Sequence, residues 1–436
     1  MQQRAAIAAR PTLAAVLAWR RLCVRPWTTP LSALVAACFG TAIGLAAWGN
    51  NTIPYAALLV PLLWASFARG SVVVPMCGVA AYQLAGLRGL FAGMRQFAVT
   101  DVELGLFALA LVVACMGIGL IWALPLKWCR RPWQVGLACV GVMWVMLLPP
   151  LWVLGAGSPV AAFGFVWDGG GWFAFLALSV VLGALAGALH QLDPVRQGAV
   201  LLIALGVCVA NSTSADESFR GSEIARAVST EWRGRDLDLQ EQTDRLTKVG
   251  RLINGLAPLG VKWIILPESV IGQWTPALEF VAKLEVIQAA KGLGVEVWLG
   301  VDQRRADGLW DTGLQVIRAD GTSGYLPARQ PMPVSLWGRL FGAGYGANWG
   351  RSAIVDSPIG PVYLSVCFED VLPGMFLRDM WAGERPRAIV SVANHWFVEP
   401  GNPLAAEQSR HIEGMARLFR LRLLRAVNRP PTTPAP

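Results

Sequence analysis

Charged residues are almost absent from one half of this chain, and that absence limits its possible folds more than any other feature. Residues 1–212 contain 12 Lys/Arg and 4 Asp/Glu, whereas residues 213–436 contain 25 and 24. Uncharged runs span residues 26–68, 70–87, 104–126, 132–167, 169–192 and 197–215. About 20 apolar residues cross the hydrocarbon core of a bilayer as a helix. The pattern therefore predicts a membrane half followed by a globular half, and it excludes a disordered or fibrous chain.

The uncharged runs predict a polytopic α-helical membrane domain of about seven helices. Their expected ranges are 31–48, 54–68, 71–87, 103–126, 134–154, 172–190 and 197–212, with a turn at 49–52 dividing the first run. The resulting expected organisation is a basic cytoplasmic segment (1–30), a transmembrane domain (31–212), a globular domain (213–428) and a disordered tail (429–436).

Basic residues set the expected orientation. Arg4, Arg10, Arg20, Arg21 and Arg25 precede the first span, and Lys and Arg concentrate on the cytoplasmic side of membrane proteins. An odd number of spans then places the globular domain on the far side, the periplasmic face of a bacterial inner membrane; an even number would reverse this. The net charge of +9 lies mostly in the membrane half, so nothing indicates a nucleic-acid partner.

Cysteine and histidine placement predicts neither a metal site nor a cofactor. Seven of the eight cysteines lie in or beside the apolar half, where cysteine behaves as a small buried hydrophobe. Cys367 is the exception, and a lone thiol forms no intrachain disulfide there. The three histidines, His190, His395 and His411, have no ligand-like spacing.

Strands and helices alternate in the second half, which predicts a layered α/β domain. The expected strands are 223–229, 261–266, 295–301, 312–318, 353–355, 362–366 and 388–392, and the expected helices are 237–256, 276–291 and 403–427. Glu268 and Cys367 each follow a buried strand, where open α/β sheets place reactive groups. Glu268 could be the base that a cysteine nucleophile requires. On spacing alone the pair is weak evidence, because a glutamate at a strand end is more often solvated and a cysteine there is more often packed.

Five sequence blocks, in order, resemble the nitrilase (carbon–nitrogen hydrolase) superfamily. They are LPE at 266–268, DTG at 311–313 with DG at 320–321, SVCFED at 365–370, ANHWF at 393–397 and LLRAVN at 423–428. With a polytopic half in front, the chain resembles the apolipoprotein N-acyltransferases. A plasmid-borne branch of conjugal transfer proteins resembles it more closely, because it shares the departures described below. The resemblance covers about 210 residues and implies a nitrilase-like α/β sandwich.

The resemblance also implies a Glu–Lys–Cys triad. Cys367 would be the nucleophile that takes an acyl group as a thioester, and Glu268 the general base. Glu369 matches an additional glutamate of the acyltransferase branch. In that branch the acyl donor is a membrane phospholipid and the acceptor is the amino group of a lipoprotein. An N-acyltransferase or amidase-type enzyme is therefore the first hypothesis.

Two departures from the family pattern favour a second hypothesis. Ala328 stands where the family has its lysine; the adjacent Arg329 can supply charge as a partial substitute, but arginine does not shuttle a proton. The chain also stops eight residues after Asn428, which implies a C-terminally shortened sandwich. The second hypothesis is a catalytically impaired binding or accessory protein of a conjugation apparatus. Residues 336–349, rich in glycine and aromatics, are interpreted as a membrane-facing lid or as a packed loop.

Overall fold

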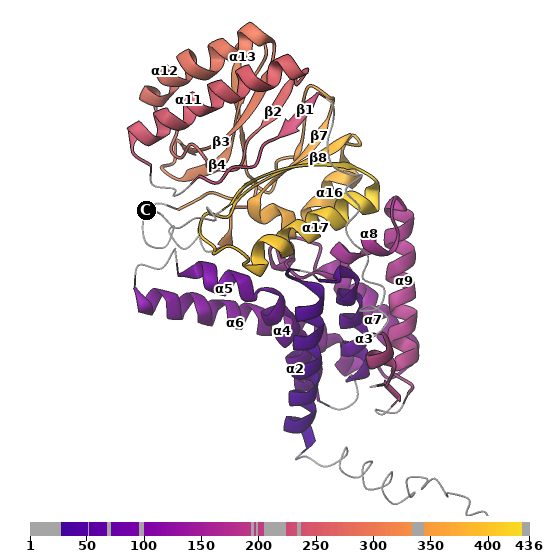
Figure 1. The fold of residues 1–436 in the computed structure, drawn as a ribbon. Helices are drawn as coiled ribbons and strands as arrows, with labels where there is room; N and C mark the ends of the chain where they lie inside the picture. The colour runs from indigo at the N-terminus through magenta and orange to yellow at the C-terminus, as the bar shows by residue number, and fades with distance from the viewer. Residues whose placement is uncertain are drawn as a thin grey trace, which may run out of the picture.

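A computed structural model of the chain describes residues 28–50, 52–67, 71–95, 100–192, 196–197, 199–204, 224–232, 237–333 and 344–429. These residues form a helical part and a layered α/β part that lie against each other (Figure 1). The basic segment 1–27, the end of the expected seventh span (205–212), most of the expected lid (336–343) and the tail from 430 lie outside the described residues.

The apolar half is helical, as its composition predicts. Its α-helices are α2 (Thr28–Ala47), α3 (Leu59–Ser66), α4 (Val73–Gly86), α5 (Arg88–Met94), α6 (Asp101–Ala123), α7 (Pro132–Val145), α8 (Phe163–Val166) and α9 (Gly171–Leu189). Short 3₁₀ segments connect them: η1 (Pro54–Leu58), η2 (Leu124–Trp128), η3 (Leu151–Leu154) and η4 (Pro159–Ala162). Helix α6 begins at a capping box in which Thr100 accepts the backbone N–H of Glu103.

Three of the described helices are long and apolar enough to cross a membrane: Thr29–Ala47, Asp101–Trp128 and Gly171–Leu189. A fourth candidate is the pair α4 and α5, bent by 56°. The expected spans at 54–68 and 134–154 contain shorter helices, and every residue of α3 is buried. The described residues therefore give three or four candidate spans where the sequence predicts seven, and the end of the expected seventh span lies outside them.

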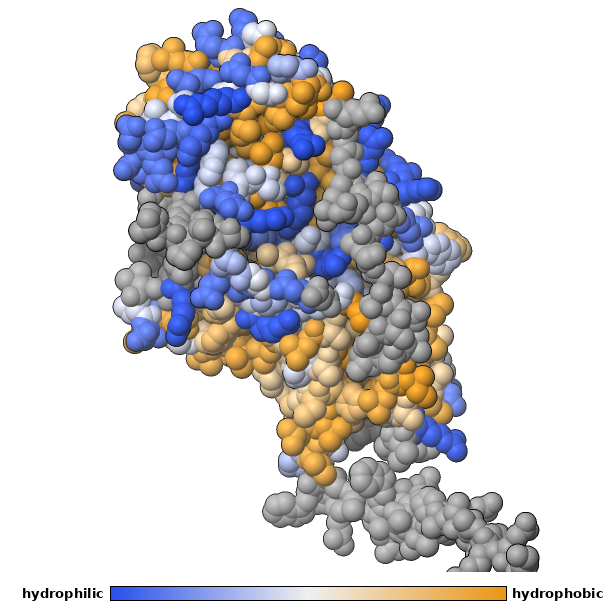
Figure 2. All heavy atoms as spheres, viewed as in Figure 1, coloured by the Kyte–Doolittle hydropathy of each residue, from blue (hydrophilic) through white to orange (hydrophobic). Residues whose placement is uncertain are grey.

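The exposed side chains of the long helices are apolar. Helix α2 exposes Leu31 and Leu34, α6 exposes Leu109 and Val113, and α9 exposes Phe173. Figure 2 shows this surface as a largely hydrophobic region beneath the more polar α/β part. Contiguous apolar surface of this extent is typical of a face in contact with lipid or another protein.

Two β-sheets pack face to face in the α/β part. The first has the order β1-β2-β3-β4-β5, with strands Ala225–Ala227, Trp263–Ile265, Glu296–Arg304, Trp310–Ile317 and Ser323–Pro327. The second has the order β6-β7-β8-β9, with strands Ile354–Val355, Val362–Val366, Ala388–Asn394 and Arg422–Asn428. Strands β1 to β3 are parallel to one another, as are β7 to β9. Apolar side chains from both sheets, including Trp263, Trp298, Leu364 and Val390, form the core between them.

Helices cover both outer faces, which gives a four-layer α/β sandwich (Figure 1). The first sheet is covered by α11 (Leu239–Leu256), α12 (Pro276–Ala282), a π-helical turn (Lys283–Ile287) and α13 (Gln288–Leu293). The second is covered by α16 (Pro373–Ala382) and α17 (Pro403–Phe419). Phe376, Met415 and Leu418 from these two helices share a hydrophobic core with Phe163 and Phe175 of the helical half. Helix α17 therefore lies between the second sheet and the helical half.

The expected helix over 403–427 is wrong in its second part. Helix α17 ends at Phe419, Arg420 adopts a left-handed φ of 53°, and β9 follows. Leu424 and Ala426 face the core between the sheets, while Leu423 packs toward the helical half. This alternation has the period of a strand. The leucine-rich run fits helical spacing as well, so periodicity alone did not separate the two structures.

Close backbone contact fixes α17 against the helical half. A Cβ atom added at Gly414 would lie 1.8 Å from the carbonyl oxygen of Ala161, and one at Gly164 would lie 1.9 Å from that of Gly414. Gly414→Ala is expected to lower the free energy of unfolding by about 2 kcal/mol, because backbone must move to admit the methyl group. Thermal unfolding in detergent measures this. Gly255→Ala, at a helical glycine with open space around it, is the control and should not destabilise; equal losses in both variants would contradict the prediction.

Candidate active site

Glu268 and Cys367 lie together in one small pocket of about 60 Å³. Glu268 follows β2 and Cys367 follows β7, so each sheet contributes one of them from the carboxyl end of a parallel strand. The rest of the described lining combines polar and apolar residues: Ser269, Thr312, Asn394, Pro331, Met332, Tyr345, Val366, Phe368, Trp396 and Phe397. The arrangement expected from the strand ends is therefore present.

Cys367 sits in a sharp turn between β7 and a 3₁₀ segment. Its φ is 50°, a left-handed conformation that a residue other than glycine rarely adopts and that is common at functional sites. The 3₁₀ segment, Cys367–Val371, begins at the same residue. The turn thus directs the thiol into the pocket at the amino end of a short helix.

The Cys367 thiol and the Glu268 carboxylate line the same pocket, where the carboxylate acts on the pKa of the thiol. Burial raises the pKa of Cys367 well above its usual range, and the negative charge and hydrogen bond of Glu268 raise it further. The backbone N–H of Asn394 offsets part of this increase. The thiol is consequently protonated at neutral pH, with a proton acceptor in the same pocket.

Three hydrogen bonds fix Glu268. The hydroxyl of Thr312 donates to Oε1 at 3.3 Å, and the backbone N–H of Asn394 donates to Oε2 at 3.2 Å. The Asn394 side-chain amide donates to the backbone oxygen of Glu268 at 3.0 Å, and Asn428 donates to Asn394 Oδ1 at 2.9 Å. The sequence blocks that contain Thr312, Asn394 and Asn428 therefore orient the base.

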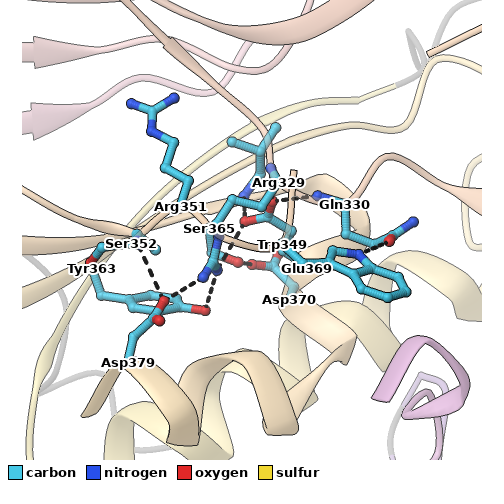
Figure 3. A network of polar contacts seen from close by, with 12 residues as sticks. Arg329, Gln330, Trp349, Arg351, Ser352, Tyr363, Ser365, Glu369, Asp370 and Asp379 are labelled. Carbon is cyan, nitrogen blue, oxygen red and sulfur yellow. Dashed lines mark hydrogen bonds and ion pairs between the residues drawn. The ribbon is translucent and has the colours of Figure 1, made fainter. Parts of the chain in front are cut away.

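Arg329 does not line the pocket. Its side chain is 2% exposed and forms ion pairs with Asp379 and, at 3.4 Å, with Glu369. It also donates a hydrogen bond of 2.8 Å to Tyr363. Figure 3 shows the guanidinium directed toward Asp379 and Tyr363. Ala328, at the position of the family lysine, is buried in the core between the sheets, so neither residue presents a cation to Cys367.

Glu369 holds the segment that follows β5. Its carboxylate accepts the backbone N–H groups of Arg329, of Gln330 at 3.0 Å and of Val366 at 3.3 Å. Because Pro331 and Met332 come next and line the pocket, Glu369 places one wall of the site. It does not itself line the pocket.

A second buried network lies behind the Cys367 turn. Asp370 accepts hydrogen bonds from Ser365 at 2.6 Å, Ser391 at 2.8 Å and Arg425 at 2.7 Å. These partners come from β7, β8 and β9, so one carboxylate joins the three strands (Figure 3 shows Ser365 and Asp370).

Some pocket residues were not assigned from sequence. Thr312 and Asn394 lie inside the sequence blocks that carry the family resemblance, but the sequence did not indicate what either residue does. His395 is buried, and burial lowers its pKa to about 4; it does not line the pocket. Across the part of the chain that the structure describes, no group of three His, Cys, Asp or Glu side chains could hold a metal ion.

The expected lid is described only in part. Tyr345 lines the pocket, and Trp349 donates to Gln330 Oε1 at 2.6 Å (Figure 3) and lies edge-on to Trp152 at 5.7 Å. Trp349 therefore packs between the α/β part and the helical half.

Two known proteins with related sequences are named as conjugal transfer proteins. A probable conjugal transfer protein TraB from Sinorhizobium fredii is 28% identical over 406 residues, covering 88% of this chain and 95% of that protein. The conjugal transfer protein TraB from Agrobacterium fabrum is 27% identical over 446 residues, covering 96% and 98%. The chain is similar to TraB over most of its length. This confirms the resemblance to the conjugal transfer branch. No family model matches the chain.

Solved structures with a likeness to this chain belong to the carbon–nitrogen hydrolases. One from Helicobacter pylori has a TM-score of 0.36 and 12% identity, covering 46% of this chain and 73% of that chain. An amidase from Nesterenkonia sp. has a TM-score of 0.34 and 15% identity, covering 48% and 77%.

Proposed function

We propose that the pocket is a thiol acyl-transfer site, in which Cys367 attacks an acyl carbonyl and Glu268 accepts the thiol proton. The observation that carries the proposal is the placement of the Cys367 thiol and the Glu268 carboxylate in one pocket, at the carboxyl ends of parallel strands from the two sheets. A thiol with a raised pKa needs a base at the moment of attack rather than a preformed thiolate. Glu268, fixed by Thr312 and Asn394, meets that need.

The reaction has two halves. As the S–C bond forms, the thiol proton moves to Glu268; the leaving group then departs with that proton and leaves a thioester on Cys367. An amine attacks the thioester, its proton passes through Glu268 to the sulfur, and the free thiol returns. Backbone N–H groups at the start of a helix have no partner within the helix. Those of the segment Cys367–Val371 are suitable donors to the carbonyl oxygen as it gains negative charge.

The surroundings favour a substrate delivered at a membrane surface. A Cβ atom at Gly93 of α5 would lie 2.8 Å from the ring of Phe397, and Phe368 packs with Leu87 and Trp152 of the helical half. Both phenylalanines line the pocket. The proposal therefore includes a phospholipid acyl donor and a protein or peptide amine as acceptor.

The cellular setting follows from the expected topology and from the similarity to TraB. In the proposed arrangement, residues 31–212 cross a bacterial inner membrane seven times, and residues 213–428 form a globular domain on its periplasmic side. The proposed role is in conjugal plasmid transfer. The helices Thr29–Ala47 and Gly171–Leu189, both able to span a bilayer, support the membrane location.

Trapping the thioester tests the activity. Protein in liposomes with acyl-labelled phospholipid is expected to carry label on Cys367 that hydroxylamine releases. Cys367→Ala should abolish this label, and Glu268→Gln should slow its appearance by roughly 10²–10⁴-fold. Cys38→Ala, which removes an exposed cysteine of α2, is the control and should label normally. Absence of label on Cys367 in the unaltered protein would overturn the proposal.

Glu268→Gln is also expected to lower the pKa of the Cys367 thiol. The substitution removes the charge and the hydrogen-bonded carboxylate that raise this pKa, while burial of the sulfur remains. The pH profile of iodoacetamide alkylation, followed by mass spectrometry of the Cys367 peptide, should shift to lower pH. An unchanged profile would mean that the two side chains do not interact.

A second candidate function is a binding or accessory role without acyl transfer. Burial of Ala328 in the core and pairing of Arg329 with Asp379 favour it, because neither residue replaces the family lysine. On this reading, Cys367→Ala leaves the frequency of plasmid transfer between cells unchanged, whereas deletion of the whole chain lowers it.

A further inference from the structure

One side chain of α17 contacts the backbone of the candidate nucleophile. The Gln408 amide donates a hydrogen bond from Nε2 to the backbone oxygen of Cys367, and its Oε1 is paired with Nε2 of His395. Gln408 is buried and does not line the pocket. It is therefore placed to act on Cys367 through the main chain rather than on a substrate.

We propose that Gln408 is a positioning residue that holds Cys367 in its left-handed conformation and so keeps the thiol against Glu268. A φ of 50° is unfavourable for cysteine, and such a conformation persists only where surrounding contacts hold it. A hydrogen bond to the Cys367 carbonyl fixes the peptide plane that follows the strained residue. Without this bond, the turn can relax to negative φ and carry the thiol away from Glu268.

His395 determines which way the Gln408 amide points. The Cys367 carbonyl can only accept, so the amide NH₂ group must face it and Oε1 must face His395. His395 is neutral because burial lowers its pKa to about 4, and its Nε2–H then donates to Gln408. The backbone N–H of His395 donates to the Asn428 oxygen at 2.8 Å, and the preceding residue, Asn394, holds Glu268. One group of contacts thus fixes both the thiol and its base.

The helical half fixes α17 on both sides of Gln408. On one side, the Asn402 amide donates to the backbone oxygen of Gly89, in the first turn of α5, at 3.2 Å. On the other, His411 stacks on Trp48 with ring centroids 4.1 Å apart and accepts the backbone N–H of Gly157 at 2.9 Å. Because these contacts fix α17 and Gln408 lies on it, the position of the helical half affects the geometry of the pocket.

The test uses the full chain in detergent with two variants of Gln408. Gln408→Met keeps the length of the side chain and removes both hydrogen bonds; Gln408→Glu keeps an acceptor for His395 and removes the donor to Cys367. The readout is the pH profile of iodoacetamide alkylation at Cys367. In Gln408→Met the profile is expected to move down by about one pH unit, because separation from Glu268 removes part of what raises the thiol pKa. Gln408→Glu should abolish the contact with the Cys367 carbonyl and lower the yield of thioester.

A matched control and a double variant separate positioning from general stability. Gln242→Met removes a buried amide of α11 that donates to the Ile271 and Gln273 oxygens at 2.9 and 3.1 Å; it should leave the alkylation profile unchanged. In Glu268→Gln with Gln408→Met, the shift should equal that of Glu268→Gln alone, since both act through one contact. Additive shifts, or an unshifted profile in Gln408→Met, would overturn the inference.

The inference rests on the proposed function only in taking Cys367 as the reacting atom. Alkylation reports on the thiol whether or not an acyl group is transferred. A shifted profile without any thioester would therefore contradict the acyl-transfer proposal and leave the role of Gln408 standing.

Discussion

Replacing Arg329 by methionine is expected to destabilise the α/β part by about 3–5 kcal/mol, the usual cost of breaking a buried ion pair. The guanidinium is 2% exposed. Its removal leaves the buried Glu369 carboxylate without its ion-pair partner and leaves Asp379 paired with Arg378 alone. The hydrogen bond to Tyr363 is lost as well. A large fall in the thermal unfolding midpoint in detergent would show this.

Removing the whole charge network should restore most of that stability. Arg329→Met combined with Asp379→Asn and Glu369→Gln removes the three buried charges and leaves only the partly exposed Arg378 without its carboxylate. Neutral replacement of a buried network is often tolerated. The exposed pair Lys283–Glu279, at 3.5 Å, supplies the control: Lys283→Met should change stability by less than about 1 kcal/mol. If Arg329→Met lowers stability no more than Lys283→Met does, the structural role given to Arg329 is contradicted.

Replacing Glu407 by glutamine is expected to stabilise the protein at neutral pH. Glu407 lies on α17 at the contact with the helical half, is 0% exposed, and has no hydrogen-bond partner for either carboxylate oxygen in the described structure. Burial raises its pKa from 4.5 to about 8, although Arg88 opposes this shift. Tyr82 of α4, Cys115 of α6 and His411 of α17 are the other titratable groups nearby.

The sign of the pH dependence follows from these values. The folded state binds the Glu407 proton more tightly than the unfolded state, so stability is retained below pH 4.5 and is lost as the pH rises toward 8. Glu407→Gln should therefore raise the free energy of unfolding by on the order of 3 kcal/mol at pH 7 and by almost nothing at pH 4. Unfolding midpoints of the two proteins across this range measure the difference. Glu413→Gln, on the same helix but paired with Arg410 and Arg417, should be slightly destabilising at both pH values.

The central pair of the candidate site could be predicted because its position depends on topology. Glu268 and Cys367 follow buried parallel strands, and the carboxyl ends of such strands meet at one edge of a sheet. The direction of Arg329 could not be predicted, because it depends on Asp379, Glu369 and Tyr363, which are distant in sequence. The role of Gln408 could not be predicted for the same reason, because its hydrogen-bond partner Cys367 lies 41 residues away in the sequence.

The fold was predictable where the sequence pattern allowed one structure. Strand Val362–Val366 is buried throughout and apolar except for Ser365, and it lies where expected. The run after Phe419 satisfies both helical and strand spacing, and pairing with β8 decides in favour of a strand. The number of spans stays a prediction: the described residues contain three or four candidates, and α3 shows that hydropathy alone does not separate a lipid-facing helix from one buried within the protein.

The double-sided burial of α17 has a practical consequence for biochemistry. One face packs toward the second sheet, and the other contributes Met415 and Leu418 to a core shared with the helical half. A fragment beginning at residue 224 would leave that second face uncovered in water, where apolar surface drives aggregation. Purification of the intact chain in detergent or lipid nanodiscs is therefore the route to a native preparation, and a water-soluble fragment would be a misleading sample in which to judge whether the thiol reacts.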